Sequence, residues 1–150
     1  MKRLVYTSLI AIVLDRIIKL LVMSLDKSIV IIKNFFNITY VTNLGGAWSI
    51  LSGHRWLLVI VGILALILIY FVFIRNTKLN KLSSITLGLL IGGITSNLLD
   101  RIIYGYVIDY LDFNIFGYNY PIFNLADSLI VISVIILIFI EFKGDKHVRG

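Results

Sequence analysis

Two aspartates, Asp109 and Asp127, stand among apolar residues in the last third of the chain. Two carboxylates held together in a poorly hydrated site cannot both ionise readily, so they tend to share one proton. One can then act as a base on a water molecule while the other acts as an acid toward a carbonyl oxygen or a leaving amine. If the fold brings them together, this pair predicts water-mediated cleavage of a peptide bond.

The composition indicates a membrane protein. Of the 150 residues, 59% are hydrophobic and 15% are charged, and the mean hydropathy is +1.00. Soluble domains are roughly 45–50% apolar and about 25% charged, and a soluble chain this apolar could not cover its own core. The net charge of +6 lies at the ends of apolar runs, which favours a role in membrane topology over a nucleic-acid surface.

The residue types needed for thiol or histidine chemistry are missing or misplaced. The chain has no cysteine, which excludes disulfides, thiolate metal sites and a cysteine nucleophile. His54 and His147 are far apart in the sequence and are expected on opposite sides of the membrane. Neither a histidine-based metal site nor a Ser-His-Asp triad can be built from them.

Four segments are long and apolar enough to be transmembrane helices, each close to the roughly 20 residues that a bilayer core requires. They cover approximately residues 4–24, 56–74, 82–103 and 122–142. We therefore expect an all-α membrane protein with four transmembrane helices, in which residues 1–150 form a single domain.

Positively charged residues predict the orientation, because they are enriched in cytoplasmic loops. Three clusters fall on one side if there are four spans: Lys2 and Arg3; Arg75, Lys78 and Lys81; Lys143, Lys146 and Arg149. Both termini are therefore expected in the cytoplasm, with the loops 25–55 and 104–121 outside. The second of these loops turns around Gly117, which brings Asp109 and Asp127 to the same outer depth.

The two outward loops contain extended segments. Residues 29–41 are rich in β-branched and aromatic side chains, and Phe36, Ile38 and Tyr40 alternate with polar residues. Residues 110–120 carry a Phe-Gly-Tyr-Asn turn signal between aromatic residues. We expect a small β-rich platform on the outer face of the bilayer, able to hold an extended peptide by strand addition. Ordinary packed loops are the alternative.

Polar residues within the spans need partners or a purpose, because a charge at the centre of a span costs about 2.5–3.5 kcal/mol. Asp15 and Lys19 are four positions apart and share a helix face, so we expect an ion pair between them. In the third span, Gly88, Gly92 and Ser96 form a stripe of small residues that is typical of close helix packing.

A second stripe in the third span contains Asn97 and Arg101, with Asp100 adjacent. Taken alone, it indicates an Asp100–Arg101 anchor at the membrane interface, with Asn97 bonded to a neighbouring helix. The spacing also leaves open that Asp109 and Asp127 are unrelated interfacial acids, one of which caps the start of the fourth helix.

Four sequence blocks occur in an order and at spacings that make them specific together. They are residues 14–19 (LDRIIK), 43–49 (NLGGAWS), 97–110 (NLLDRIIYGYVIDY) and 121–128 (PIFNLADS). In this combination the chain resembles the lipoprotein signal peptidases (signal peptidase II), the aspartyl peptidases of the bacterial inner membrane. The resemblance runs nearly from end to end.

The resemblance implies an endopeptidase that cuts prolipoproteins immediately before the lipobox cysteine, after that cysteine has received a diacylglyceryl group. It implies that Asp109 and Asp127 are the catalytic dyad. It implies a supporting or substrate-binding role for eight further residues: Asn43, Asn97, Arg101, Asn124, Asp15, Lys19, Gly45 and Asp100.

The same resemblance implies that no metal ion or organic cofactor is needed. The expected partners are diacylglyceryl-prolipoproteins, membrane lipid and lipopeptide inhibitors, and no nucleic acid. The expected location is the bacterial cytoplasmic (inner) membrane, with several spans and the active site at the outer face. Three positions depart from the family pattern: Ser96 stands where glycine is usual, Gly46 where alanine is common, and Trp48 where phenylalanine is common.

The sequence leaves two other functions to consider. Lys19 could serve Ser49, Ser96 or Ser128 in serine–lysine peptide hydrolysis, but the nearby Asp15 would keep the lysine protonated and a poor base. A small membrane transporter or binding module could use its outer-face acids to handle protons or cations. Transport would favour charges near the midplane along a path to both sides, whereas the polar residues here gather at one face.

Overall fold

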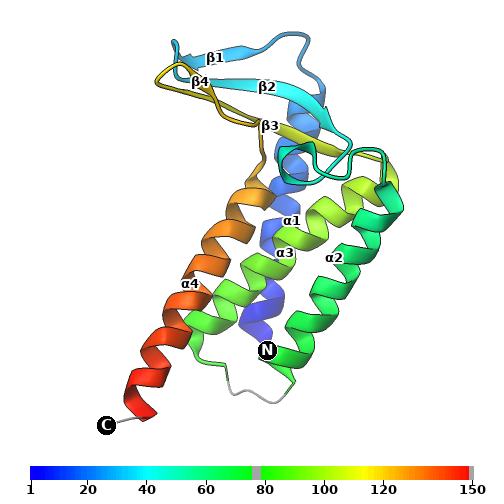
Figure 1. The fold of residues 1–150 in the computed structure, drawn as a ribbon. Helices are drawn as coiled ribbons and strands as arrows, with labels where there is room; N and C mark the ends of the chain where they lie inside the picture. Colours follow the sequence, from blue (N-terminus) through cyan, green and yellow to red (C-terminus); the bar gives the residue numbers. More distant parts are fainter. Residues whose placement is uncertain (76–78, 149–150) are drawn as a thin grey trace.

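The computed structural model describes residues 1–75 and 79–148, with side chains up to Phe142. Within these residues the chain forms four long helices and a small sheet (Figure 1). The helices are α1 (Lys2–Met23), α2 (Arg55–Ile69), α3 (Lys81–Ile103) and α4 (Leu125–Val148). A 3-10 turn, η1 (Ala47–Ser49), precedes α2, and a π-helical turn, η2 (Tyr70–Ile74), extends it. Outside the described residues lie Lys78, Arg149 and the side chains of Lys143, Lys146 and His147.

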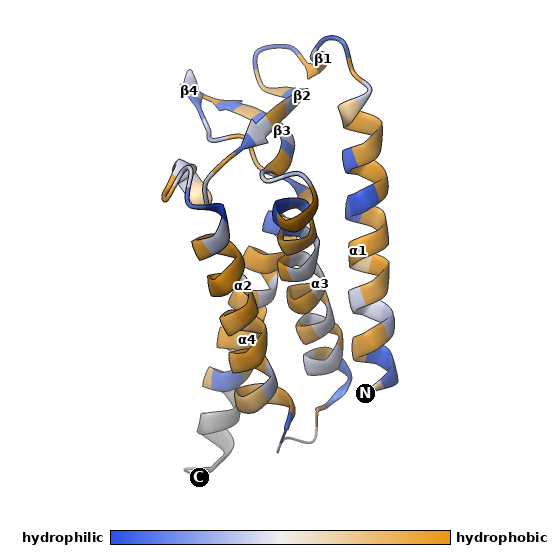
Figure 2. Cartoon of the chain, turned by 90° about the vertical axis from the view of Figure 1, so that its right-hand side faces the viewer, coloured by the Kyte–Doolittle hydropathy of each residue, from blue (hydrophilic) through white to orange (hydrophobic). Residues whose placement is uncertain are grey.

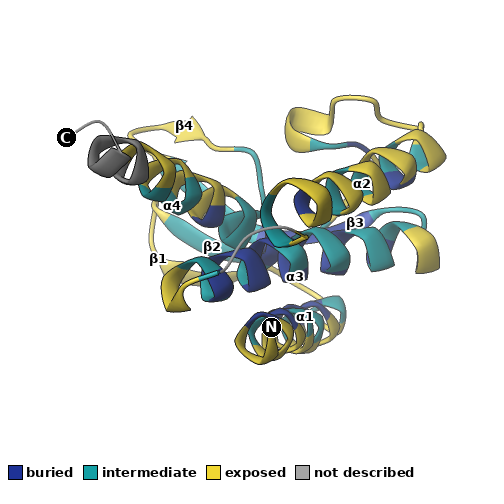
Figure 3. Cartoon of the chain, turned by 90° about the horizontal axis from the view of Figure 1, so that it is seen from below, coloured by how far each residue is buried: buried dark blue, intermediate teal, exposed yellow. Residues whose placement is uncertain are grey.

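Helix α3 forms the centre of the bundle. Seen along the helix axes, α1 lies on one side of α3, whereas α2 and α4 lie on the other (Figure 3). A Cβ atom at Gly92 would lie 2.7 Å from the Cβ of Ala11, and one at Gly93 would lie 2.7 Å from the carbonyl oxygen of Ala126. Only glycine lets α3 approach α1 and α4 this closely, so the predicted packing role of the small-residue stripe is confirmed.

Three helices are long and apolar enough to cross a membrane within the described residues: Arg55–Ile74, Lys81–Ile103 and Leu125–Phe142. Helix α1 does not meet this criterion, because Asp15, Arg16 and Lys19 interrupt its apolar sequence. Figure 2 shows the contrast, since α2 and α4 are hydrophobic along most of their length while α1 has hydrophilic turns. A fourth transmembrane helix stays a prediction.

The outward loops pair into one antiparallel sheet in the order β1-β2-β3-β4. Its strands are β1 (Ile29–Ile32), β2 (Phe36–Asn43), β3 (Val107–Ile115) and β4 (Tyr118–Asn119). The sheet lies at the end of the bundle opposite the N-terminus (Figure 1). The predicted extended segments are therefore confirmed, and the alternative of ordinary packed loops is wrong.

The predicted start of the fourth helix at residue 122 is wrong by three residues. Phe123 pairs with Leu111 of β3 in an isolated bridge, which holds the chain extended at this point. The helix begins only at Leu125, where the backbone N–H donates to the hydroxyl oxygen of Tyr110 at 3.1 Å. The sheet thus fixes where α4 starts.

Candidate active site

Asp109 lies in β3, where the sheet meets the helices, and its residue is 2% exposed. The antiparallel pairing of β2 with β3 sets Val41 opposite Asp109 and brings Asn43 close to it. The side-chain amide of Asn43 donates to Oδ2 of Asp109 at 2.9 Å, and that of Asn124 donates to Oδ1 at 2.7 Å. Both carboxylate oxygens of Asp109 therefore have an N–H donor.

Asp127 lies in the first turn of α4 and takes part in a reciprocal cap with Asn124. The backbone N–H of Asp127 donates to Oδ1 of Asn124 at 2.9 Å, while the backbone N–H of Asn124 donates to Oδ2 of Asp127 at 3.2 Å. This pattern is the capping box, in which two unpaired N–H groups at a helix start are satisfied. The remaining oxygen, Oδ1, accepts from Asn97 of α3 at 2.7 Å.

The side chain of Asn124 joins the two aspartates. Its amide oxygen accepts from the backbone of Asp127, and its amide nitrogen donates to the carboxylate of Asp109. The alternative in which one acid caps the fourth helix is thus correct for Asp127, but the two acids are not unrelated. The helix cap itself holds Asp127 beside Asn124, whose side chain is hydrogen-bonded to Asp109.

Each of the three asparagines turns its amide nitrogen toward a carboxylate because a different donor occupies its amide oxygen. These donors, all at 2.9 Å, are the N–H of Gly45 for Asn43, Nζ of Lys19 for Asn97, and the N–H of Asp127 for Asn124. The three amide nitrogens and the backbone N–H of Asn124 together supply one donor to each oxygen of the two carboxylates.

At Asp109, burial raises the pKa by more than the hydrogen-bond donors lower it. Loss of water and the nearby carboxylate of Asp127 raise the pKa of Asp109 to about 7, although the hydrogen bonds from Asn43 and Asn124 act in the opposite direction. Asp109 therefore exchanges its proton near neutral pH, as a general acid or base requires.

A buried ion cluster supports the site from the side of α1. Nζ of Lys19 lies 2.7 Å from Oδ2 of Asp15 and 2.7 Å from Oδ2 of Asp100, and all three side chains are fully buried. The third donor of Lys19 goes to Asn97. The predicted Asp15–Lys19 pair is confirmed, and Ser96 adds a 2.6 Å hydrogen bond to Asp15. A glycine, usual at this position in the family pattern, could not make that bond.

The predicted Asp100–Arg101 anchor is wrong. Asp100 faces α1, where it also pairs with Arg16 at 2.8 Å. Arg101 instead donates to the carbonyl oxygen of Gly45 at 2.8 Å and lines the site. Arg16 had no predicted role, although a charge inside an apolar helix signals a buried partner.

Gly45 is held tightly in the loop that follows β2. A Cβ atom there would lie 2.7 Å from the carbonyl carbon of Ser49 and 2.8 Å from the carbonyl oxygen of Ile50. A Cβ atom at Gly46 would meet only ordinary contacts, at 3.6 and 3.8 Å. Alanine, common in the family at position 46, therefore fits this structure.

We expect Gly45→Ala to lower kcat/KM for the peptide cleavage predicted from Asp109 and Asp127 by about tenfold or more. Overpacking costs about 1–3 kcal/mol, and each 1.36 kcal/mol of lost transition-state stabilisation is a factor of ten in rate. Gly46→Ala is the matched control and should stay within about twofold of the wild type, a margin set by ordinary surface substitutions. Equal losses in the two variants would contradict this account of the loop.

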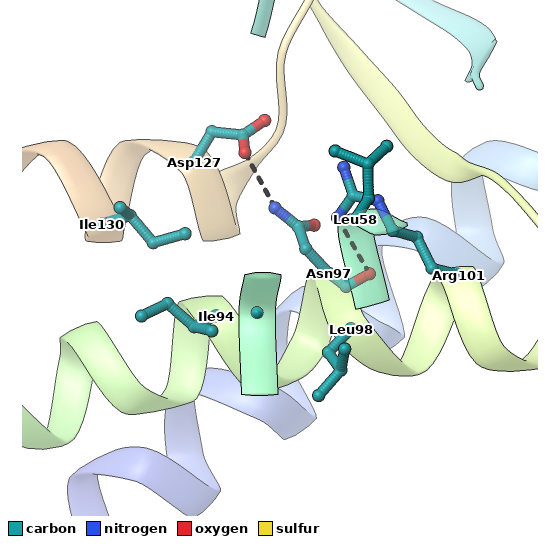
Figure 4. A pocket seen from close by; sticks show the side chains of 8 residues that line it. Leu58, Ile94, Asn97, Leu98, Arg101, Asp127 and Ile130 are labelled. Atoms are coloured by element: carbon teal, nitrogen blue, oxygen red, sulfur yellow. Dashed lines mark hydrogen bonds between the residues drawn. The ribbon is translucent and has the colours of Figure 1, made fainter. Parts of the chain in front are cut away.

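An apolar cavity of about 190 Å³ adjoins the carboxylate of Asp127 (Figure 4). Helices α2, α3 and α4 all contribute to its lining, which consists of Leu58, Gly62, Ile94, Asn97, Leu98, Arg101, Asp127 and Ile130. The loop of residues 44–54 lies near the site, where the ring of Trp48 meets that of Tyr120 edge-on, with 6.3 Å between centroids. The site can thus receive an apolar residue beside the two acids.

The serine–lysine alternative does not fit this geometry. Lys19 donates to Asp15, Asp100 and Asn97, so the described contacts occupy all three of its N–H groups. The hydroxyl of Ser128 donates to the carbonyl oxygen of Asn124.

Among the described residues, no group of three or more His, Asp or Glu side chains could hold a metal ion.

Comparison with known proteins decides the family. A profile of the family described as Signal peptidase (SPase) II matches residues 7–143. The chain belongs to the signal peptidase II family. It is therefore a membrane aspartic peptidase, which removes the transporter alternative. A lipoprotein signal peptidase of Halothermothrix orenii is 45% identical over 92% of this chain and 94% of its own. One of Staphylococcus aureus is 38% identical over 92% of this chain and 90% of its own.

Solved structures of bacterial membrane enzymes share the fold of this signal peptidase II member. One has a TM-score of 0.88 and 34% identity, with coverage of 100% of this chain and 93% of that chain. Another has a TM-score of 0.84 and 35% identity, with coverage of 95% and 94%. The similarity extends over the helices and the sheet together.

Proposed function

We propose that the chain removes signal peptides from diacylglyceryl-modified prolipoproteins, cutting immediately before the lipidated lipobox cysteine. The arrangement of Asp109 and Asp127 around the side chain of Asn124 carries this proposal. Membership of the signal peptidase II family supports the substrate class, since the relatives are lipoprotein signal peptidases.

The two aspartates share one proton and divide the acid and base roles. Asp109, whose pKa is about 7, holds the proton at and below neutral pH. Asp127 takes a proton from water as the hydroxyl oxygen bonds to the carbonyl carbon, and Asp109 donates its proton to the carbonyl oxygen. When the C–N bond breaks, Asp127 gives its proton to the leaving amine of the lipidated cysteine, and Asp109 takes a proton back from a hydroxyl of the tetrahedral intermediate. The other product is a free carboxyl group.

The supporting residues orient these groups rather than exchange protons. Asn43, Asn97 and Asn124 hold both carboxylates in place through their amide nitrogens. Arg101, which lines the cavity next to Asp127, can donate to a peptide carbonyl of the substrate. The same apolar cavity suits lipopeptide inhibitors.

All four helices cross the bacterial cytoplasmic membrane in our proposal, with both termini in the cytoplasm and the site at the outer face. The obstacle is the charge in α1, but Asp15 and Lys19 are fully buried against α3 and paired. These charges do not face lipid, which removes most of their insertion cost. Residues 1–150 then act as one domain in contact with membrane lipid.

The proposal is tested with purified protein in lipid bilayers. A lipobox peptide with a diacylglyceryl cysteine should be cut. At equal membrane-bound concentration, the same peptide with an unmodified cysteine should be cut at least about tenfold more slowly, because binding energy from the lipid is then missing in the transition state. Equal rates on the two peptides at equal membrane-bound concentration would show that the lipid is not recognised.

The pH dependence follows from Asp109. We expect kcat/KM to fall as pH rises above about 7, because Asp109 then loses the proton that it donates. The hydrogen bond from Asn43 lowers the pKa of Asp109, so Asn43→Ala should raise that pKa and move the alkaline limb of the pH profile to higher pH. A limb that stays in place or moves to lower pH in this variant would contradict the assignment of the acid.

A further inference from the structure

A second apolar cavity, of about 650 Å³, lies further along the same side of α3. Its lining comes from the same three parts of the bundle as that of the first cavity: Val72, Phe73, Leu90, Val134, Leu137, Ile138 and Glu141. Ile94 and Ile130 of the first cavity are one helical turn from Leu90 and Val134 of the second. The two cavities therefore follow each other along one groove between α2 and α4, with α3 as its floor.

The far end of this groove carries an acid. Glu141 lines the second cavity from α4, at the end of the bundle that holds the N-terminus. The other charged side chains described at this end, Lys2, Arg3, Arg75 and Lys81, are all basic. Within the described part of the chain, Glu141 is thus the acidic group that an incoming basic segment would meet there.

The groove has the length of a signal peptide. Asp127 and Glu141 are about four turns apart on α4, or about 21 Å at 1.5 Å per residue. A signal peptide consists of a positively charged segment, an apolar segment of about 7–15 residues, and the cleavage site. An apolar helix of that length, cut beside Asp127, places its basic segment at the level of Glu141.

The helix that lines the groove is irregular at this end. The N–H of Arg75 donates to the carbonyl oxygen of Tyr70 at 2.9 Å, which closes the π-helical turn η2. Such turns are rare and are frequent at functional sites. Val72 and Phe73 lie in this turn and line the second cavity.

We propose that Glu141 binds the basic segment of the signal peptide, so that the groove from Asp127 to Glu141 holds the substrate by both ends of its apolar helix. This inference rests on the proposed function and adds a specificity residue to it. Glu141 is about 21 Å from Asp127 along α4. It therefore contributes to the binding of substrate and not to the chemical step, so its loss is expected in KM with kcat unchanged.

The test compares two diacylglyceryl lipobox peptides, one with two lysines in the basic segment and one with glutamines in their place. For the wild type we expect the neutral peptide to have a KM about three- to tenfold higher, as for one ion pair worth about 1 kcal/mol. For Glu141→Gln we expect the same raised KM for both peptides, with kcat unchanged. Asp26→Asn, a substitution in the outward loop 25–55, is the matched control and should discriminate like the wild type.

Lengthening the apolar segment by one turn gives an independent check, because it moves the lysines past Glu141 and should abolish the difference between the charged and neutral peptides. If Glu141→Gln still discriminates between the two peptides as the wild type does, the proposal is wrong and the groove holds lipid or the apolar helix alone. If the wild type cuts neither peptide, the proposed function fails instead, so the two failures are distinguishable.

Discussion

Asp109→Asn and Asp127→Asn are each expected to reduce kcat for cleavage of a diacylglyceryl lipobox peptide by at least about 100-fold. General acid–base catalysis by a positioned side chain contributes about 10²–10⁴-fold, and neither role passes to the amide of asparagine. The shape of the side chain is nearly unchanged, and its amide oxygen still accepts from one of the two N–H donors, although its new NH2 group faces the other donor. KM should therefore change much less than kcat.

Asp112→Asn is the matched control for this measurement. Asp112 lies in the same strand as Asp109 and accepts hydrogen bonds from Asn37 and Thr39, away from the proposed dyad. Its activity should remain within about threefold of the wild type, because this half-buried side chain keeps its shape and lies away from the dyad. The dyad account is wrong if Lys19→Ala abolishes cleavage while both dyad variants remain active.

Lys19→Met is expected to lower the free energy of unfolding by about 3–5 kcal/mol, which is the usual cost of removing one partner from a buried ion pair. Asp100 would then keep Arg16 as its described cationic partner, whereas the fully buried carboxylate of Asp15 would have none among the described residues. The measurement is a denaturant titration of the purified protein in mixed micelles. The exposed Lys27 provides the control, since Lys27→Met should change this energy by less than about 0.5 kcal/mol.

A double variant separates the charge from the shape of the cluster. Lys19→Met combined with Asp100→Asn removes one cation and one anion, so part of the lost stability should return. The loss of Lys19 also removes the shorter of two hydrogen bonds to the amide oxygen of Asn97, leaving the one from Asn124 at 3.2 Å. Asn97 then holds Asp127 less firmly even where the fold survives. A Lys19→Met protein as stable as the wild type would contradict the role of the cluster.

The sequence was sufficient for the features that repeat along the chain. Apolar length predicted the helices α2, α3 and α4, and the alternation of Phe36, Ile38 and Tyr40 predicted β2. The four-residue spacing of Asp15 and Lys19 predicted their ion pair, because residues four apart share a helix face. These features depend on local periodicity, which the sequence displays directly.

The directions of neighbouring polar residues were harder to predict. Asp100 and Arg101 are adjacent in sequence, but consecutive helix positions point about 100° apart. One therefore faces α1 and the other faces the cavity, and the anchor between them does not form. The start of α4 was missed although Asn124 and Asp127 form a capping box there. The bridge between Phe123 and Leu111, which keeps the chain extended just before this cap, has no signal in the local sequence.

The hydrogen-bond network of the three asparagines could not be predicted from the residue types and their spacing. The motif blocks named Asn43, Asn97 and Asn124 as site residues, but their orientations depend on donors from a loop, from α1 and from the start of α4. These donors come together only in the folded protein, where the sheet packs against the ends of the helices. The structure therefore adds a physical reason for three asparagines around two aspartates.

The most direct test of the central claim is the mass of the products released from a diacylglyceryl lipobox peptide by the purified wild type and by the double variant Asp109→Asn/Asp127→Asn. We predict one cut by the wild type, immediately before the lipidated cysteine, and no detectable product with the double variant. A cut at another bond, or the same product formed by the double variant at the wild-type rate, would contradict the account.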